Sequence, residues 1–96
     1  MNTIKNILIT GASSGIGEAL ALYYAKNGAK TLFLCGRNKQ RLDKVADECK
    51  KIGADTYAKV LDVTDKEKVA QWIKSCNKKA RLHLVFANAG VSTGEE

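Results

Sequence analysis

The segment Thr10-Gly11-Ala12-Ser13-Ser14-Gly15-Ile16-Gly17 decides how this chain folds. It follows the short apolar run Ile7-Leu8-Ile9, which is typical of a strand buried on both faces. After it, Ile16, Leu20 and Tyr23 recur at helical spacing until Asn27-Gly28, a typical end of a helix. The segment is therefore predicted to be the turn between a strand and a helix over residues 15–27.

Each of the three glycines in this turn has a predicted role. Gly11 allows a tight turn, Gly15 leaves space where a pyrophosphate would approach, and Gly17 lets the helix pack close to the sheet. The backbone N–H groups and the helix dipole at such a turn favour a bound phosphate. No lysine follows the last glycine, so the spacing disfavours a Walker-type NTPase.

Strand and helix patterns alternate along the rest of the chain. Strands are predicted over residues 31–35, 56–61 and 82–87. One helix is predicted between the cap Asn38 and Gly53, and a third helix opens at the capping-box pattern Thr64-x-x-Glu67. Because the connections are short, each strand-helix-strand unit is predicted to be parallel and right-handed. The fold class is therefore α/β, with half of a doubly wound sheet.

Composition limits the class of protein and its partners. The 96 residues are 45% hydrophobic and 27% charged, which is typical of one soluble domain. The net charge of +6 permits an anionic partner, but basic and acidic residues are interspersed along the chain, which disfavours nucleic-acid binding. No apolar stretch approaches the ~18 residues that span a membrane, and no signal peptide is evident. A cytoplasmic protein without a membrane or nucleic-acid partner is expected.

The cysteines and the histidine do not indicate a metal site or a disulfide framework. Cys35, Cys49 and Cys76 are widely spaced and form no C-x-x-C pair. His83 is the only histidine, and it stands in an apolar predicted strand. A structural role is favoured for His83 over that of a catalytic base.

Four motifs at the ends of the successive predicted strands resemble the short-chain dehydrogenase/reductase family: residues 10–17, Gly36-Arg37, Asp62-Val63 and Asn88-Ala89-Gly90. The resemblance covers essentially all 96 residues. It implies a Rossmann-like doubly wound parallel sheet, truncated after four strands in the order 3-2-1-4 with three helices. Residues 1–96 would form a single N-terminal part of an NAD(P)-binding domain. The implied activity is hydride transfer between a nicotinamide cofactor and an alcohol or carbonyl substrate.

The resemblance also implies which residues contact the cofactor. Those around its ribose and phosphates would be Gly11, Ser13, Ser14, Gly15, Ile16 and Gly17. Asp62 and Val63 would lie beside the adenine, and residues 88–90 would border the adenosine ribose. Within that last group, Asn88 is expected mainly to tie the central strands together. Ala87 departs from the asparagine that is more common in the family.

The end of the second strand bears on the choice between NADP and NAD. An acidic residue there would hydrogen-bond the ribose 2′-OH of NAD, but this chain has Gly36-Arg37. A guanidinium can form bidentate bonds with the 2′-phosphate of NADP, and a glycine leaves room for that phosphate. NADP is therefore favoured over NAD. The alternative is that Arg37 is simply a solvated loop residue.

The catalytic groups of the family would lie beyond the Asn-Ala-Gly motif. They are a serine and a Tyr-x-x-x-Lys pair, whereas this sequence ends six residues after Gly90. Tyr23, Tyr24 and Tyr57 have no lysine four positions on. No catalytic residue is assigned, the C-terminal catalytic half is taken as absent, and the chain is expected to be inactive alone.

The sequence also permits other functions. One is a non-catalytic nucleotide-binding or protein-interaction remnant of such an enzyme. A phosphoacceptor receiver-like domain is disfavoured, because Thr10-Gly11-Ala12 supplies no acid to accompany Asp62. In the family order the fourth strand would have a bare edge, which is a template for another chain. Self-association, or pairing with a complementary C-terminal half through that strand, is therefore expected.

Overall fold

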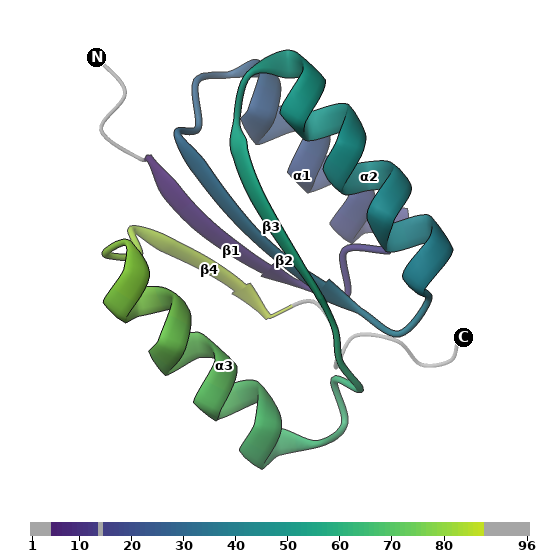
Figure 1. The fold of residues 1–96 in the computed structure, drawn as a ribbon, viewed down its shortest axis with the longest axis vertical. Coiled ribbons are helices and arrows are strands. Elements are labelled where there is room, and N and C mark those ends of the chain that lie inside the picture. The colour runs from purple at the N-terminus through teal and green to yellow at the C-terminus, as the bar shows by residue number, and fades with distance from the viewer. Residues whose placement is uncertain (1–4, 14, 88–96) are drawn as a thin grey trace.

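The computed structural model describes residues 5–13 and 15–87. A four-stranded parallel sheet in the order β3-β2-β1-β4 lies between helices on its two faces (Figure 1). The elements follow one another as β1 (Asn6–Thr10), α1 (Gly15–Lys26), β2 (Thr31–Gly36), α2 (Lys39–Ile52), β3 (Asp55–Val60), α3 (Lys66–Lys79) and β4 (Leu84–Ala87). The predicted fold class, strand order and number of helices are confirmed.

The two faces of the sheet carry two separate apolar clusters. Ile7 and Ile9 of β1 point to the side of α1 and α2, whereas Leu8 points to the side of α3. All three residues are fully buried, as expected for a strand covered on both faces. Figure 1 shows α1 and α2 together on one face and α3 alone on the other.

The face that α1 buries consists of small residues. Ile16 and Tyr23 are exposed, and the buried positions are Gly17, Ala21 and Ala25. Small side chains let the helix axis approach the sheet closely. The stability gained from this close packing is greater than that from burying the larger residues on the neighbouring face. The spacing of Ile16, Leu20 and Tyr23 predicts the helix itself, and of these three residues Leu20 packs on the apolar cluster.

Local capping signals set both ends of α2. The Asn38 side chain accepts a hydrogen bond of 3.0 Å from the Arg41 backbone N–H, as predicted. Gly53 ends the helix with a left-handed backbone, and its N–H bonds to the carbonyls of Cys49 and Lys50. The residues that α2 buries form one stripe at helical spacing: Leu42, Val45, Ala46 and Cys49.

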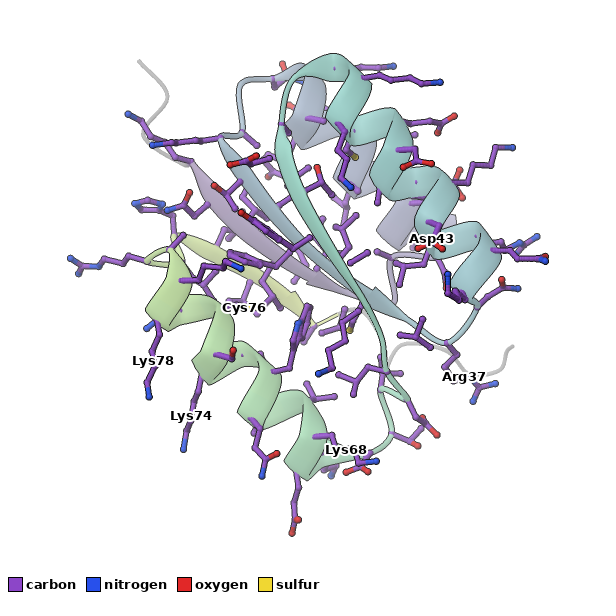
Figure 2. The ribbon with its side chains drawn as sticks, in the orientation of Figure 1. Arg37, Asp43, Lys68, Lys74, Cys76 and Lys78 are labelled. Carbon is purple, nitrogen blue, oxygen red and sulfur yellow. The ribbon has the colours of Figure 1, made fainter. Side chains whose placement is uncertain are left out.

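The predicted capping box at the start of α3 is wrong. The cap is Asp65, whose side chain accepts a bond of 3.2 Å from the Lys68 N–H. The N–H and the hydroxyl of Thr64 both donate to the Asp62 carboxylate, at 2.9 and 2.7 Å. The inward face of α3 buries Trp72 and Cys76. Figure 2 shows Cys76 on the sheet side of α3 and Lys74 and Lys78 pointing outward.

The fourth strand starts two residues later than predicted. Before Leu84 the His83 N–H still donates to the Asn6 carbonyl at 2.8 Å, and side chains supply the other bonds. The His83 Nδ1 accepts a bond of 3.1 Å from the Asn6 N–H, and the Asn6 amide donates to the Arg81 carbonyl at 2.8 Å. The Asn77 side chain accepts from the Leu82 N–H at 2.9 Å. The structural role predicted for His83 is therefore the one observed.

One side of the sheet is only partly covered. Leu8 and Phe33 lie under α3 and are buried, whereas Val85 of β4 is 43% exposed and Tyr57 of β3 is 41% exposed. The described residues place β1 beside β4 and no strand on its outer side. Within the described part of the chain, the predicted bare edge at β4 is present.

Candidate cofactor-binding site

The parallel strands bring their carboxyl ends to one edge of the sheet, where the predicted motifs meet. The Ala12 N–H donates to the Cys35 carbonyl at 2.8 Å, so the turn after β1 is tied to the end of β2. The Leu61 N–H donates to the Gly36 carbonyl at 2.9 Å, which ties the end of β2 to that of β3. Three of the four predicted motifs therefore adjoin one another at this edge.

The glycine turn has the geometry that the spacing predicts. Gly11 and Gly15 have positive φ angles of 68° and 51°. A Cβ at Gly17 would lie 2.8 Å from the carbonyl carbon of Gly11 and 2.9 Å from the Cα of Ala12. Gly17 is thus required for α1 to pack against the turn itself. A Cβ at Gly15 would meet nothing within 4 Å among the described residues, so the turn has open space at that point.

Ser13 and Gly36 touch across the turn. A Cβ at Gly36 would lie 2.6 Å from the Ser13 Oγ and 2.9 Å from the Ser13 Cβ. Ser13 is only 8% exposed. The space beside Gly36 that was expected to take a phosphate is therefore occupied by the Ser13 side chain. Sequence reasoning missed this contact, because it joins two turns that are distant in the chain.

Ile16 is the most exposed large apolar residue described. Its exposure is 64%, and it lies in the first turn of α1, directly after the open space at Gly15. An apolar side chain at the mouth of a phosphate-type turn loses water contact when a ligand covers it. Ser14, the remaining predicted residue of the turn, lies outside the described residues.

Arg37 follows β2 directly and is exposed. Figure 2 shows its side chain projecting outward at the carboxyl edge of the sheet. Its positive charge helps to lower the pKa of Asp62 at the end of β3. The structure therefore places this cation between the glycine turn and the third motif.

The Asp62 carboxylate holds the loop after β3. Hydrogen bonds from the Thr64 side chain and backbone are the main cause of its lowered pKa, and the charges of Arg37 and Lys68 act in the same direction. Val63 is half-buried and packs on the apolar cluster under α3. Thr64 was not predicted to belong to the site, although Asp-x-Thr is a pattern that forms such side-chain-to-backbone turns.

Cys35 lies at the base of the glycine turn. Burial raises the pKa of its thiol to about 11, and a hydrogen bond with the Gly11 backbone opposes part of this rise. A thiol with such a pKa is protonated at neutral pH and is not a nucleophile. The three cysteines are free and buried, and Cys35 contributes packing to the site.

The described tyrosines have packing partners. The ring of Tyr57 stacks on Phe33 with 5.4 Å between centroids, and the Lys79 Nζ lies 4.3 Å from its centroid. Tyr24 packs on Phe86 at 5.7 Å. These contacts give the two rings structural roles.

Three further features bear on the nature of the site. Within residues 5–13 and 15–87, no cluster of His, Cys, Asp or Glu could hold a metal ion. None of the helices in this part is both long and apolar enough to cross a bilayer. A cavity of about 520 Å³ lies between β3 and α3, away from the glycine turn, and is lined by Lys59, Val60, Leu61, Lys68, Gln71, Trp72 and Ser75.

Comparison with known proteins identifies the family. Residues 5–96 match the family model described as short chain dehydrogenase. An uncharacterized oxidoreductase of Listeria innocua is 38% identical over 92 residues, which cover 93% of this chain and 37% of that protein.

Solved structures agree with this result. An NAD+-bound xylitol dehydrogenase superposes with a TM-score of 0.82 at 30% identity, over 92% of this chain and 35% of the other. A metagenomic short-chain oxidoreductase in complex with NADP superposes with a TM-score of 0.80 at 27% identity, over 92% and 40%. The chain thus spans about a third of the length of the relatives. Taken with the glycine turn and the strand order, these matches show that the chain belongs to the short-chain dehydrogenase/reductase family.

Proposed function

We propose that this chain is the NADP(H)-binding half of a short-chain dehydrogenase/reductase, an oxidoreductase that transfers hydride between a nicotinamide cofactor and an alcohol or carbonyl substrate. The observation that carries the proposal is the glycine turn at the carboxyl edge of the sheet, with open space at Gly15 and α1 packed on the turn through Gly17. In open α/β sheets, ligands bind at this edge.

The phosphates would lie over the turn, at the N-terminal end of α1. The backbone N–H groups and the helix dipole would stabilise their charge there. Ile16 would lose its exposure under the bound dinucleotide. The adenosine end would extend toward Asp62 and Val63. Residues 88–90, which lie outside the described part, would border its ribose.

NADP is the proposed cofactor because Arg37 is an exposed cation at the end of β2. Its guanidinium would form charge-assisted hydrogen bonds with the 2′-phosphate, which NAD lacks. The Asp62 carboxylate accepts its hydrogen bonds from Thr64, and the charge of Arg37 acts on it by lowering its pKa. NAD is the less favoured cofactor.

Catalysis is proposed to need groups outside residues 1–96. In the described part the tyrosines contribute packing, and Tyr23, Tyr24 and Tyr57 have no lysine four positions on. The chain alone is therefore proposed to bind the cofactor without turning it over. The cytoplasm is the proposed compartment, since buried free thiols suit a reducing environment.

Titration with NADPH and NADH tests the proposal. We expect saturable binding with a preference for NADPH, measured by calorimetry or by NADPH fluorescence. Arg37→Asp should reverse the preference, whereas Lys44→Asp, an equal change of charge on the exposed face of α2, should leave it unchanged. Unchanged selectivity in Arg37→Asp would remove the proposed role of Arg37. Absence of binding at millimolar ligand would favour the protein-interaction remnant.

The bare edge of β4 supports the proposal that this chain pairs with another chain. Unpaired backbone groups and the exposed Val85 would be covered by a second copy of the chain or by a complementary C-terminal half. Sedimentation of the isolated chain should show a species larger than 10.4 kDa, or a monomer that binds a dye specific for apolar surface. A sharp monomer that binds no dye would exclude both partners.

A further inference from the structure

β3 forms one edge of the sheet, opposite the edge formed by β4. β2 lies on its inner side, and within the described part of the chain no strand lies on its outer side. All residues of β3 except Thr56 are exposed. Figure 1 shows β3 in front of the other strands, with α2 on one side, α3 on the other and no helix across it. The outer edge of β3 is therefore open to a second strand.

Alternate residues of β3 direct their backbone groups outward. The Asp55 N–H donates to the Lys30 carbonyl at 2.9 Å, and the Leu61 N–H donates to the Gly36 carbonyl at 2.9 Å. The odd-numbered residues of this segment therefore bond to β2. The N–H and carbonyl groups of the even-numbered residues within 56–60 point away from the sheet. A strand added at this edge has to form its hydrogen bonds with those even-numbered residues.

The exposed side chains of Asp55, Tyr57 and Lys59 lie on the face of the sheet that α3 covers. Tyr57 stacks on Phe33 on this face, and Lys59 lines the cavity between β3 and α3. Neither Asp55 nor Lys59 has an ion-pair partner among the described residues. Along the edge, this face of β3 therefore carries a negative charge, an aromatic ring and a positive charge, evenly spaced.

We propose that β3 is a self-complementary edge, on which a second copy of this chain pairs antiparallel about a two-fold axis at Tyr57. In this register, Asp55 of each copy lies opposite Lys59 of the other, and the two Tyr57 side chains lie opposite each other. Thr56 of each copy lies opposite Ala58 of the other, and these residues exchange the outward hydrogen bonds. The proposal concerns a surface away from the glycine turn and does not rest on the proposed cofactor.

The two charges select both the partner and the register. An isolated charge on an edge strand opposes pairing with a foreign strand. The antiparallel copy supplies an opposite charge to Asp55 and to Lys59 at the same time. A parallel copy in register would place like charges side by side. An antiparallel copy centred on Ala58 would place Lys59 opposite Tyr57 and would leave Asp55 without a lysine opposite.

Tyr57 supplies the apolar part of the interface. It is the direct register partner of Phe33, and it is 41% exposed. The Tyr57 ring of the second copy would cover part of this exposed surface, so that the row of aromatic rings would continue from one sheet into the other. Because the interface consists of one short strand from each copy, we expect a weak dimer whose population depends on concentration.

Charge reversal tests the interface, with the dissociation constant of the dimer measured by sedimentation equilibrium. Asp55→Lys and Lys59→Asp should each weaken the dimer at least about tenfold, because attractive pairs become repulsive ones. The double variant keeps the net charge of the wild type and should restore the dimer. Lys44→Asp makes the same change of charge on the exposed face of α2 and should leave the dissociation constant unchanged.

Mixing the two single variants gives a second measure of complementarity. Each variant alone has two like charges on its edge. In a mixed pair, the two lysines of one variant lie opposite the two aspartates of the other. An equimolar mixture should therefore form a heterodimer more tightly than either variant forms a homodimer, and high salt should weaken it. A mixture that associates no better than its components would contradict the proposed register.

Disulfide cross-linking tests the register directly. In Tyr57→Cys the two new thiols lie on a non-hydrogen-bonded pair with about 4.5 Å between α-carbons, within the range of a disulfide. In Ala58→Cys, the matched control, they lie on a diagonal pair about 7–8 Å apart, beyond that range. The three natural cysteines are buried. Mild oxidation should therefore cross-link Tyr57→Cys and leave Ala58→Cys largely monomeric on a non-reducing gel.

The remaining outcomes decide against the proposal. Equal association of the wild type and both charge-reversal variants would show that the copies do not meet at β3. A wild-type chain that stays monomeric at millimolar concentration, together with Tyr57→Cys that does not cross-link, would also overturn it. If a single variant does not fold, the double variant and the two cysteine variants still give the answer. A chain that binds NADPH without dimerising through β3 would leave the proposed function intact.

Discussion

The α-carbon of Gly17 packs directly against the backbone of Gly11, with no space between them for a methyl group. This contact sets how closely α1 approaches the turn after β1. It is also why the buried stripe of the helix consists of Gly17, Ala21 and Ala25 and not of its larger residues. The position of the helix N-terminus at the proposed phosphate site therefore depends on one missing side chain.

Gly17→Ala is expected to destabilise the fold by about 2–3 kcal/mol, because a Cβ would overlap backbone atoms that cannot rotate away. Gly15→Ala is the matched control. Its Cβ would meet open space, so the free energy of unfolding should fall by about 1–2 kcal/mol, from the positive φ alone. Urea denaturation monitored by circular dichroism measures both. A smaller loss in Gly17→Ala than in Gly15→Ala would contradict the close contact.

His83→Leu should destabilise the chain by about 1 kcal/mol, because the Asn6 N–H loses the acceptor that the imidazole provides. His83→Asn is the control, since its side-chain oxygen can take the position of Nδ1. Hydrogen exchange of the Asn6 amide gives a local readout. Exchange should accelerate in His83→Leu and return toward the wild-type rate in His83→Asn; equal protection in all three chains would rule out the bond.

Stability should fall as the pH rises from about 9 to 11. Burial raises the pKa of the Cys35, Cys49 and Cys76 thiols to about 11, whereas an unfolded cysteine has a pKa of about 8.5. A group whose pKa is raised by folding stabilises the folded state below its unfolded pKa, and this contribution is lost as the pH rises through the folded value.

The measurement is the urea midpoint as a function of pH, compared with that of Cys49→Ala. Removing one buried thiol should make the urea midpoint fall less steeply as the pH rises. Reaction with a thiol reagent at pH 7.5 provides a second readout, with slow labelling of the native chain and rapid labelling in urea. Rapid labelling of the native chain would show that the thiols are accessible.

Thr64→Val should raise the pKa of Asp62, because it removes the hydroxyl that is the main cause of the lowered value. Lys68→Gln should have a smaller effect, since its charge is the weakest of the causes. Carboxyl chemical shifts in an NMR titration report both changes. Folding lowers this pKa, so the stabilising contribution is present at neutral pH and is lost as the pH falls through the folded value. An unchanged pKa in Thr64→Val would exclude the hydrogen bond as its cause.

Several features of the fold and of the site could be predicted from the sequence because their causes are local. The Asn38 cap and the Gly53 terminus depend on residues within one helical turn. The position of the glycine turn follows from the apolar strand before it and the helix after it. The capping box at Thr64 was wrong because Asp65, one residue later, is also a good cap and takes that position, while Thr64 bonds to Asp62.

The order of strands and helices, the parallel connections and the location of the glycine turn follow from the sequence itself, because apolar periodicity and glycine spacing act over short distances. The tertiary structure alone decided the contact of Ser13 with Gly36, the bond of Asn6 with His83 and the face of α1 that is buried. The first two contacts join residues that are far apart in the chain and meet only when the sheet forms, and the third depends on how closely Gly17 packs on Gly11. No local pattern in the sequence encodes the distance at which they meet.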